Sequence, residues 1–159
     1  MTPPVLLDLF SGTGSVGRVY QNHGFRVISV DINKNMHPTI TQDILQCNYK
    51  KYYPSGYFHT IFAAVPCIEF SHALTTRERD LEKGDLLVFK ALEIIRYFRP
   101  QQWFLENPKT GFLKERAYMH KLPFIDVDYC QFSMWGYQKP TRIWGGTNIQ
   151  QLASVVCQP

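Results

Sequence analysis

The sequence predicts an α/β fold in which a mostly parallel sheet is covered by helices on both faces. Two observations lead to this prediction. Short apolar runs of strand length alternate through most of the chain with segments of helical periodicity, a pattern typical of parallel strands joined by helices. Glycine and proline stand at the boundaries of these segments and do not gather into a linker, and 159 residues suit one core. We therefore expect a single domain over residues 1–159.

The first predicted strand, turn and helix follow one another directly. Residues 4–10, PVLLDLF, form a short apolar run that carries an acid near its end. The glycine turn GTGSVG comes next, and residues 15–24 then suit a helix that Gly24 ends. Residues 25–33, FRVISVDIN, predict a second buried strand that ends at Asp31.

A long amphipathic helix is predicted between two later strands. Residues 59–65, HTIFAAV, predict the strand before it, and residues 102–107, QWFLEN, the strand after it. Between residues 84 and 100 apolar side chains recur at helical spacing, and Pro100 ends the run. The apolar face of this helix is expected to contain Leu86, Leu87, Phe89, Leu92, Ile95 and Phe98.

Two closing strands complete the predicted sheet, over residues 124–130 and 141–146. In open α/β sheets, ligands bind outside the carboxyl ends of the strands. The sequence places a small set of chemically active residues there: Asp8 with the glycine turn, Asp31, Pro66 with Cys67, and Glu106 with Asn107.

The glycine turn has the pattern GxGxxG, formed by Gly12, Gly14 and Gly17, which lets a backbone approach a ligand at a helix start. A dinucleotide and S-adenosylmethionine (SAM) are both compatible with this pattern. The carboxylate of Asp8 would repel a pyrophosphate but attract the ammonium and sulfonium of SAM, so the charge favours SAM. Asp31 suits either ligand, since it can accept hydrogen bonds from ribose hydroxyls, or it is simply a cap or turn residue.

Composition narrows the class of protein. The chain is 45% hydrophobic, with no apolar run near the roughly 18 residues of a membrane helix and no signal segment at its start. We expect a soluble protein that uses no membrane. Cys47, Cys67, Cys130 and Cys157 are widely spaced, which predicts neither a zinc site nor a disulfide framework and favours an intracellular, reducing compartment, cytoplasm or nucleus. The net charge of +4 permits a polyanionic partner without establishing one.

Five segments together resemble the C5 cytosine-specific DNA methyltransferases. DLFSGTGSVG, VDIN, VPCIEFS, FLENP and YQKPTRIW occur in the order, and roughly at the spacing, of that family's sequence blocks over nearly the whole chain. The resemblance implies a Rossmann-like, SAM-dependent methyltransferase fold and activity as a DNA (cytosine-5-)-methyltransferase. It implies SAM as the cofactor, no metal, and DNA as the partner, with RNA cytosine as an alternative substrate.

The resemblance also implies roles for single residues. Cys67 matches the nucleophile that adds to C6 of cytosine, Glu106 the acid of the ENV block, and Arg142 the last arginine of the QxRxR block that holds the cytosine. Residues of the SAM loop, the pair that grips ribose and adenine, the pair beside the adenine amine and further lining positions are predicted to bind the cofactor. With Asp8, they are Phe10, Ser11, Gly12, Thr13, Gly14, Asp31, Ile32, Asp43, Ile44, Pro66 and Leu87.

Each catalytic assignment has a structural alternative. Cys67 could be a buried thiol at the end of a strand, and Glu106 a paired surface acid. Arg142 could make a surface salt bridge. Three cations after Cys67 could meet phosphates or, among interleaved acids, form a solvated face: Arg77, Arg79 and Lys83. The lysines and aromatics of residues 49–58 could stack bases, although a turn packed on the sheet also explains them.

The chain departs from the family pattern at several positions. Ile68 follows the cysteine in place of glutamine, Pro108 replaces the valine of ENV, and Pro140 stands at the penultimate arginine of QxRxR. The sequence stops at Pro159, so we expect the family's target-recognition domain and last helix to be absent. Three hypotheses follow: a minimal enzyme, a subunit completed by another chain or by self-association, and a catalytically weak or inactive module that binds nucleic acid or a partner.

Overall fold

The computed structural model describes residues 1–132 and 138–147 of the chain. The described residues form one mixed sheet with the strand order β3-β2-β1-β4-β5-β7-β6. The strands are β1 (Val5–Leu9), β2 (Arg26–Asp31), β3 (Ile40–Thr41), β4 (Thr60–Ala64), β5 (Gln102–Pro108), β6 (Phe124–Asp128) and β7 (Pro140–Gly146).

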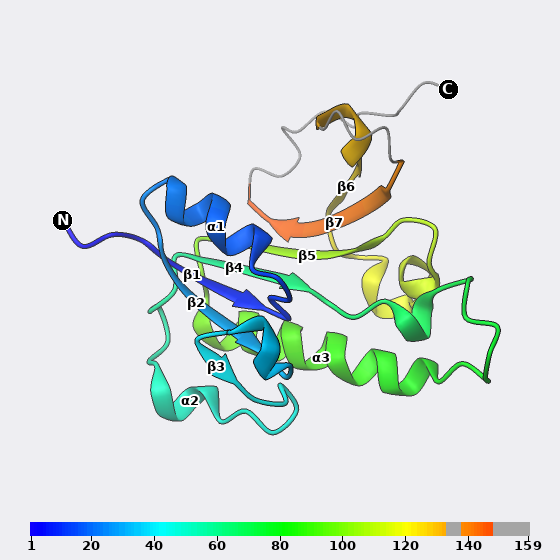
Figure 1. Cartoon of the computed structure of the whole chain (residues 1–159), viewed down its shortest axis with the longest axis horizontal. Helices are drawn as coiled ribbons and strands as arrows, with labels where there is room; N and C mark the ends of the chain where they lie inside the picture. The colour runs from blue at the N-terminus through cyan, green and yellow to red at the C-terminus, as the bar shows by residue number, and fades with distance from the viewer. Residues whose placement is uncertain (133–137, 148–159) are drawn as a thin grey trace.

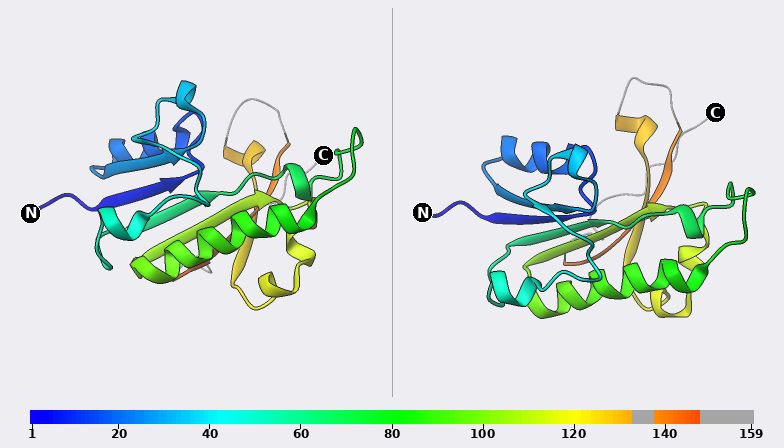
Figure 2. Two further views of the ribbon diagram at one scale, coloured as in Figure 1. Left: turned by 90° about the horizontal axis from the view of Figure 1, so that it is seen from below. Right: turned by 60° about the horizontal axis from the view of Figure 1, so that its bottom comes forward.

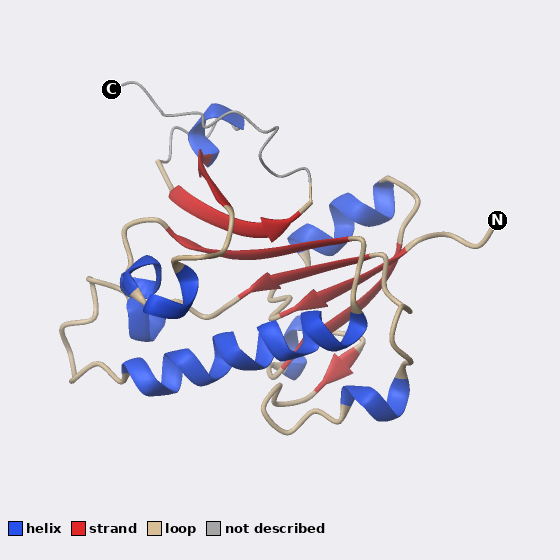
Figure 3. Cartoon of the chain, turned by 180° about the vertical axis from the view of Figure 1, so that it is seen from behind, coloured by secondary structure: helices blue, strands red, loops and turns tan. Residues whose placement is uncertain are grey.

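The sheet has a parallel part and an antiparallel part. Strands β3, β2, β1, β4 and β5 are parallel to their neighbours, whereas β7 runs antiparallel to both β5 and β6. Figures 1 and 3 show β7 and β6 beyond β5, at the opposite edge of the sheet from β3. The predicted α/β fold with a mostly parallel sheet is therefore confirmed.

Helices cover both faces of the parallel part. Helix α1 (Ser15–Asn22) lies on one face and α3 (Leu81–Phe98) on the other, as Figure 2 shows. The remaining helical segments are short: η1 (Lys34–Met36), α2 (Tyr49–Tyr52), η2 (Ile68–Phe70), η3 (Phe112–Glu115), η4 (Ala117–Met119) and η5 (Tyr129–Phe132).

Helix α3 differs from its prediction at its start and in its buried face. It begins at Leu81, where the side chain of Asp80 accepts a hydrogen bond from the Lys83 N–H at 3.0 Å and caps the helix. The residues that pack on the sheet include Val88, Ala91, Ile94, Ile95 and Phe98. Two of the predicted apolar positions, Leu86 and Phe89, are 54% and 47% exposed because the helix turns that side away from the sheet.

Residues 49–58 pack into the core and do not present a base-stacking surface. Tyr49 and Phe58 are only 7% and 2% exposed, and the ring of Phe58 meets that of Phe98 edge to face at 4.7 Å. The turn packed on the sheet, one of the two sequence interpretations, is the one observed.

Two further observations bear on the compositional expectations. None of the helices in the described ranges is long and apolar enough to cross a membrane. Cys47 and Cys67 carry free thiols, whereas Cys130 is disulfide-bonded. The expectation of no disulfide is corrected for Cys130, since spacing along the sequence does not show which cysteines the fold brings together.

Candidate active site

The predicted functional residues converge at the carboxyl edge of the parallel part. Leu9 of β1 lies beside Val30 of β2, and Ala64 of β4 lies beside Glu106 of β5. Cys67 follows three residues after Ala64, in the loop that leaves β4 at the same edge. The topology thus brings together the glycine loop, Asp31, the Cys67 loop and Glu106, as parallel strands require.

The glycine loop is closed by Asp31. Gly12 and Gly14 have positive φ angles of 50° and 73°, in the left-handed region that favours glycine. The Gly12 N–H donates to Asp31 Oδ2 and the Asn33 N–H donates to Asp31 Oδ1, both at 2.8 Å. Asp31 is therefore a turn residue as well as a candidate ligand group, because each carboxylate oxygen retains a further lone pair.

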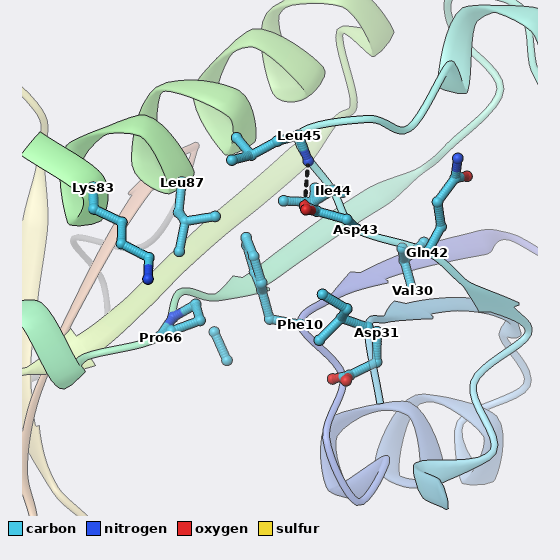
Figure 4. A pocket seen from close by; sticks show the side chains of 12 residues that line it. Phe10, Val30, Asp31, Gln42, Asp43, Ile44, Leu45, Pro66, Lys83 and Leu87 are labelled. Carbon is cyan, nitrogen blue, oxygen red and sulfur yellow. Dashed lines mark hydrogen bonds between the residues drawn. The ribbon is translucent and has the colours of Figure 1, made fainter. Parts of the chain in front are cut away.

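A cavity of about 360 Å³ opens beside this loop. Figure 4 shows Phe10 and Leu87 facing a common space, with Lys83 extending from α3 towards Pro66. Its walls include seven predicted cofactor residues: Phe10, Asp31, Ile32, Asp43, Ile44, Pro66 and Leu87. The sequence interpretation missed Val30, Gln42, Leu45, Ala64 and Lys83 as lining residues.

The other predicted cofactor residues line a different hollow, of about 220 Å³, on the α1 side of the loop. These are Asp8, Ser11, Gly12, Thr13 and Gly14. The structure therefore divides the predicted set between two sides of one loop. The hydroxyl of Ser11 is buried and has no hydrogen-bond partner among the described residues.

Asp8 is the most buried of the candidate cofactor residues, at 1% exposure. Burial raises its pKa from 3.8 to about 6, although the backbone N–H of Gly17 counteracts part of the shift. The nearby charge of Asp31 raises the pKa further. A ligand cation in the adjoining hollow would favour the ionised form of Asp8.

Cys67 lies on a loop that is anchored to the neighbouring strand. It is partly buried, its thiol is free, and its carbonyl accepts a hydrogen bond from the Phe70 N–H at 3.0 Å as η2 begins. The fully buried Asn107 donates from Nδ2 to the carbonyl of Val65 at 2.8 Å. This bond fixes the end of β4, and hence Cys67, relative to the end of β5.

Glu106 is buried at the same edge, with 9% exposure. Burial raises its pKa, and the charge of Lys139 lowers it by a smaller amount. Lys139 Nζ lies 3.9 Å from Glu106 Oε1, and this oxygen accepts no hydrogen bond from the residues that the structure describes. Because Glu106 is the register partner of Ala64, which lines the larger cavity, its carboxyl group borders that cavity.

Arg142 is not brought together with Glu106. In β7 it pairs with Asn107, whereas Ile143 pairs with Glu106, so the alternation of side chains places Arg142 on the opposite face of the sheet. There its guanidinium donates to both carboxylate oxygens of Asp126, at 2.7 and 2.9 Å. The contact observed is therefore the salt bridge that the sequence left open as an alternative.

The arginines after Cys67 organise their own loop. Arg77 donates to both carboxylate oxygens of the buried Glu69, at 2.5 and 3.0 Å, and the Asp80 N–H donates to the same carboxylate at 2.8 Å. Arg79 donates to the Ser71 carbonyl at 2.6 Å. These arginines are committed to internal contacts, so they are neither a solvated face nor free phosphate ligands.

No group of three or more His, Cys, Asp or Glu side chains in residues 1–132 and 138–147 is placed to hold a metal ion. The candidate site instead combines an apolar cavity, a thiol and a buried carboxyl group at one sheet edge. This combination on a Rossmann-like sheet defines the class of SAM-dependent methyltransferases.

Comparison with solved structures supports the fold. An E. coli protein described as a DNA modification methyltransferase encoded within a prophage matches 90% of this chain with a TM-score of 0.67 and 17% identity. The Dnmt2 methyltransferase of S. pombe matches 89% with a TM-score of 0.61 and 15% identity. The chain spans 46% and 50% of these two proteins, about half their length.

Sequence comparison identifies the family. The family described as C-5 cytosine-specific DNA methylase matches residues 5–138. A protein of frog virus 3 (isolate Goorha), described as a DNA (cytosine-5)-methyltransferase, is 36% identical over 96% of this chain and 74% of its own length. The chain therefore belongs to the C-5 cytosine-specific DNA methylase family, which confirms the resemblance seen in its sequence blocks.

Proposed function

We propose that this protein transfers a methyl group from SAM to C5 of cytosine in DNA, with Cys67 as the nucleophile. The observation that carries the proposal is the pairing of β4 with β5. It sets Glu106 beside Ala64, a wall residue of the larger cavity, with Cys67 three residues further along the chain. Family membership supports the reaction class.

The larger cavity fits the adenosine part of SAM. Its volume lies within the range of small-molecule sites, and apolar walls such as Ile32, Ile44 and Leu87 suit a purine ring. The free lone pairs of Asp31 can accept hydrogen bonds from ribose hydroxyls. The unpaired hydroxyl of Ser11 and the carboxyl group of Asp8 lie on the other side of the loop, where they can serve the methionine part. When bound, SAM supplies an electrophilic methyl group.

Cys67 and Glu106 have complementary tasks on the base. C5 of cytosine is a poor nucleophile until a thiolate adds to C6 and pushes electron density into the ring. Glu106, whose pKa burial raises, can donate its proton towards N3 and accept a hydrogen bond from the exocyclic amine. After C5 is methylated, removal of the C5 proton allows the thiolate of Cys67 to leave.

The partly buried position of Cys67 requires the cytosine to come to it. A base stacked inside a duplex cannot present C6 to a thiol at a sheet edge, so the target base must leave the stack. Flipping costs a few kcal/mol, and less for a single strand. We therefore expect single-stranded or mismatched DNA to react faster than a matched duplex.

Covalent trapping tests the proposal. An oligonucleotide containing 5-fluorocytosine cannot lose a proton from C5, so with SAM present the active protein should remain attached through Cys67. The variant C67S should form no adduct. The variant C47S, which alters the other free thiol, one that is buried away from this edge, should trap normally.

The outcomes separate the alternatives. Failure to bind SAM at millimolar concentration in calorimetry would overturn the cofactor assignment. SAM binding without an adduct on any DNA or RNA would favour a non-catalytic module. An adduct on RNA alone would keep the chemistry and replace the substrate.

A further inference from the structure

Two cations lie near the antiparallel end of the site, and only one of them has donors to spare. The fork of Arg142 is satisfied by Asp126, which also meets Lys109 Nζ at 3.3 Å. The guanidinium of Arg142 stacks on the ring of Phe124, with 3.7 Å to the centroid. Moving Arg142 to a substrate would break all of these contacts.

Lys139 is held more loosely and on the other side. Its ammonium lies 3.9 Å from Glu106 Oε1, which is an ion pair but too long for a hydrogen bond. It also lies over the ring of Tyr129 at 5.5 Å, and its side chain is 43% exposed. An ammonium carries three donors, so Lys139 can bind a ligand without giving up a bond.

The chemistry of the base supplies a use for this cation. When a thiolate adds to C6 of cytosine, negative charge spreads over N3 and the neighbouring carbonyl oxygen O2. Glu106 can serve N3 and the exocyclic amine, which leaves O2 without a partner. A donor on the far side of Glu106 from the amine would complete the set.

We propose that Lys139 is a catalytic residue that donates a hydrogen bond to O2 of the cytosine held by Glu106, and so stabilises the charge that thiolate addition creates. The inference rests on the function proposed above. Lys139 forms and breaks no covalent bond, and it keeps its proton throughout. It supplies fixed positive charge where charge develops, next to a carboxyl group that the fold already buries.

Variants at Lys139 test this role against a matched control. For K139Q we expect methyl transfer to fall about 10- to 100-fold, less than the full loss of a buried oxyanion donor because Lys139 is half exposed. K139R should retain most of the activity, and SAM binding should be unchanged in both. K109Q removes a lysine of similar exposure, 40%, that is paired with Asp126, and its activity should match that of the wild type.

The pH dependence gives a readout that a merely structural role would not move. Lys139 and the buried phenol of Tyr129 are the titratable groups that face Glu106. Without the cation, Glu106 should hold its proton to higher pH, so the limb of the rate profile that it governs should shift upward in K139Q. K109Q should not shift it.

A substrate change tests contact with O2 directly. Sulfur is a weaker hydrogen-bond acceptor than oxygen, so the wild type should react more slowly with 2-thiocytosine than with cytosine. K139Q should show little further loss on the sulfur analogue, because the interaction is already gone. Equal losses in both proteins would overturn the assignment.

The trapping assay keeps the two proposals apart. If the wild type forms no adduct with 5-fluorocytosine, the proposed function fails first. If the wild type traps and K139Q traps at the same rate, only the role of Lys139 is lost. K139M keeps the apolar stem over Tyr129, and it provides the same test if K139Q is unstable in thermal unfolding.

Discussion

The parallel and antiparallel parts of the sheet build the site in different ways. In the parallel part, backbone loops at the strand ends create the cavity, and Phe10, Asp31 and Pro66 line it because their strands end there. In the antiparallel part, the function of a side chain depends on its register. Arg142 and Ile143 are neighbours in the chain, yet only the position of Ile143 faces Glu106. Position along a motif therefore predicts the cofactor half better than the base half.

The largest effect is expected at Glu106, where the two parts meet. E106Q cannot donate a proton towards N3, and we expect methyl transfer to fall about 100- to 1,000-fold, as for loss of one preorganised donor. SAM affinity should remain within about threefold of the wild type, because Glu106 borders the cavity without lining it. Single-turnover rates and calorimetry measure both quantities. E115Q, at an exposed site, is the control.

Asp8 offers the next largest effect and tests whether the smaller hollow belongs to the cofactor site. Its pKa in the folded protein, about 6, exceeds the ordinary 3.8, so ionisation opposes folding. Stability should fall as the pH rises from about 3.8 to about 6 and stay lower above that. D8N should therefore stabilise the free protein by about 2 kcal/mol at pH 7.5, and the gain should disappear near pH 4.

The same substitution should weaken SAM binding about tenfold, because the ionised carboxylate attracts the ligand cation. Denaturant unfolding at several pH values and calorimetry check the two expectations. A stabilised D8N that binds SAM as tightly as the wild type would show that Asp8 and its hollow lie outside the cofactor site.

A smaller effect is expected at Arg142, and it is on stability. R142Q removes two hydrogen bonds and leaves Asp126 partly buried, which should cost about 1 kcal/mol of unfolding free energy. The pKa of Asp126, which Arg142 now lowers, should rise. The folded variant should retain most of its activity. A large loss of activity with unchanged stability would instead support the role in holding cytosine that the sequence blocks imply.

The sequence predicted the strands well because their apolar runs are long and end at polar residues. It missed β3, since two residues carry no period, and it misplaced Leu86 and Phe89 because helical spacing does not show how wide the buried stripe is. In the site, the residues fixed by strand ends were found. Lys83 and Lys139 were not, because the reach of a long side chain depends on what surrounds it in three dimensions.

The smallest effect concerns the loop that follows Cys67. Arg77 and the Asp80 N–H lower the pKa of Glu69 from 4.5 to about 2, so the pairing contributes stability above about pH 4.5 and loses it as the pH falls towards 2. R77Q should raise this pKa and loosen the loop already near pH 5. Methyl transfer should fall by no more than about threefold, since Glu69 touches neither ligand and its partner Arg77 is half exposed.

Hydrogen exchange at the Asp80 amide, compared between R77Q and wild type at each pH, isolates this contact from the intrinsic pH dependence of exchange. E78Q changes an exposed neighbour of Arg77 whose backbone carbonyl, not its side chain, accepts from the guanidinium, so it should leave protection unchanged. Equal protection in R77Q and wild type would mean that η2 alone fixes the loop. The anchoring of Cys67 would then come from the parallel part, through Asn107, and not from its own loop.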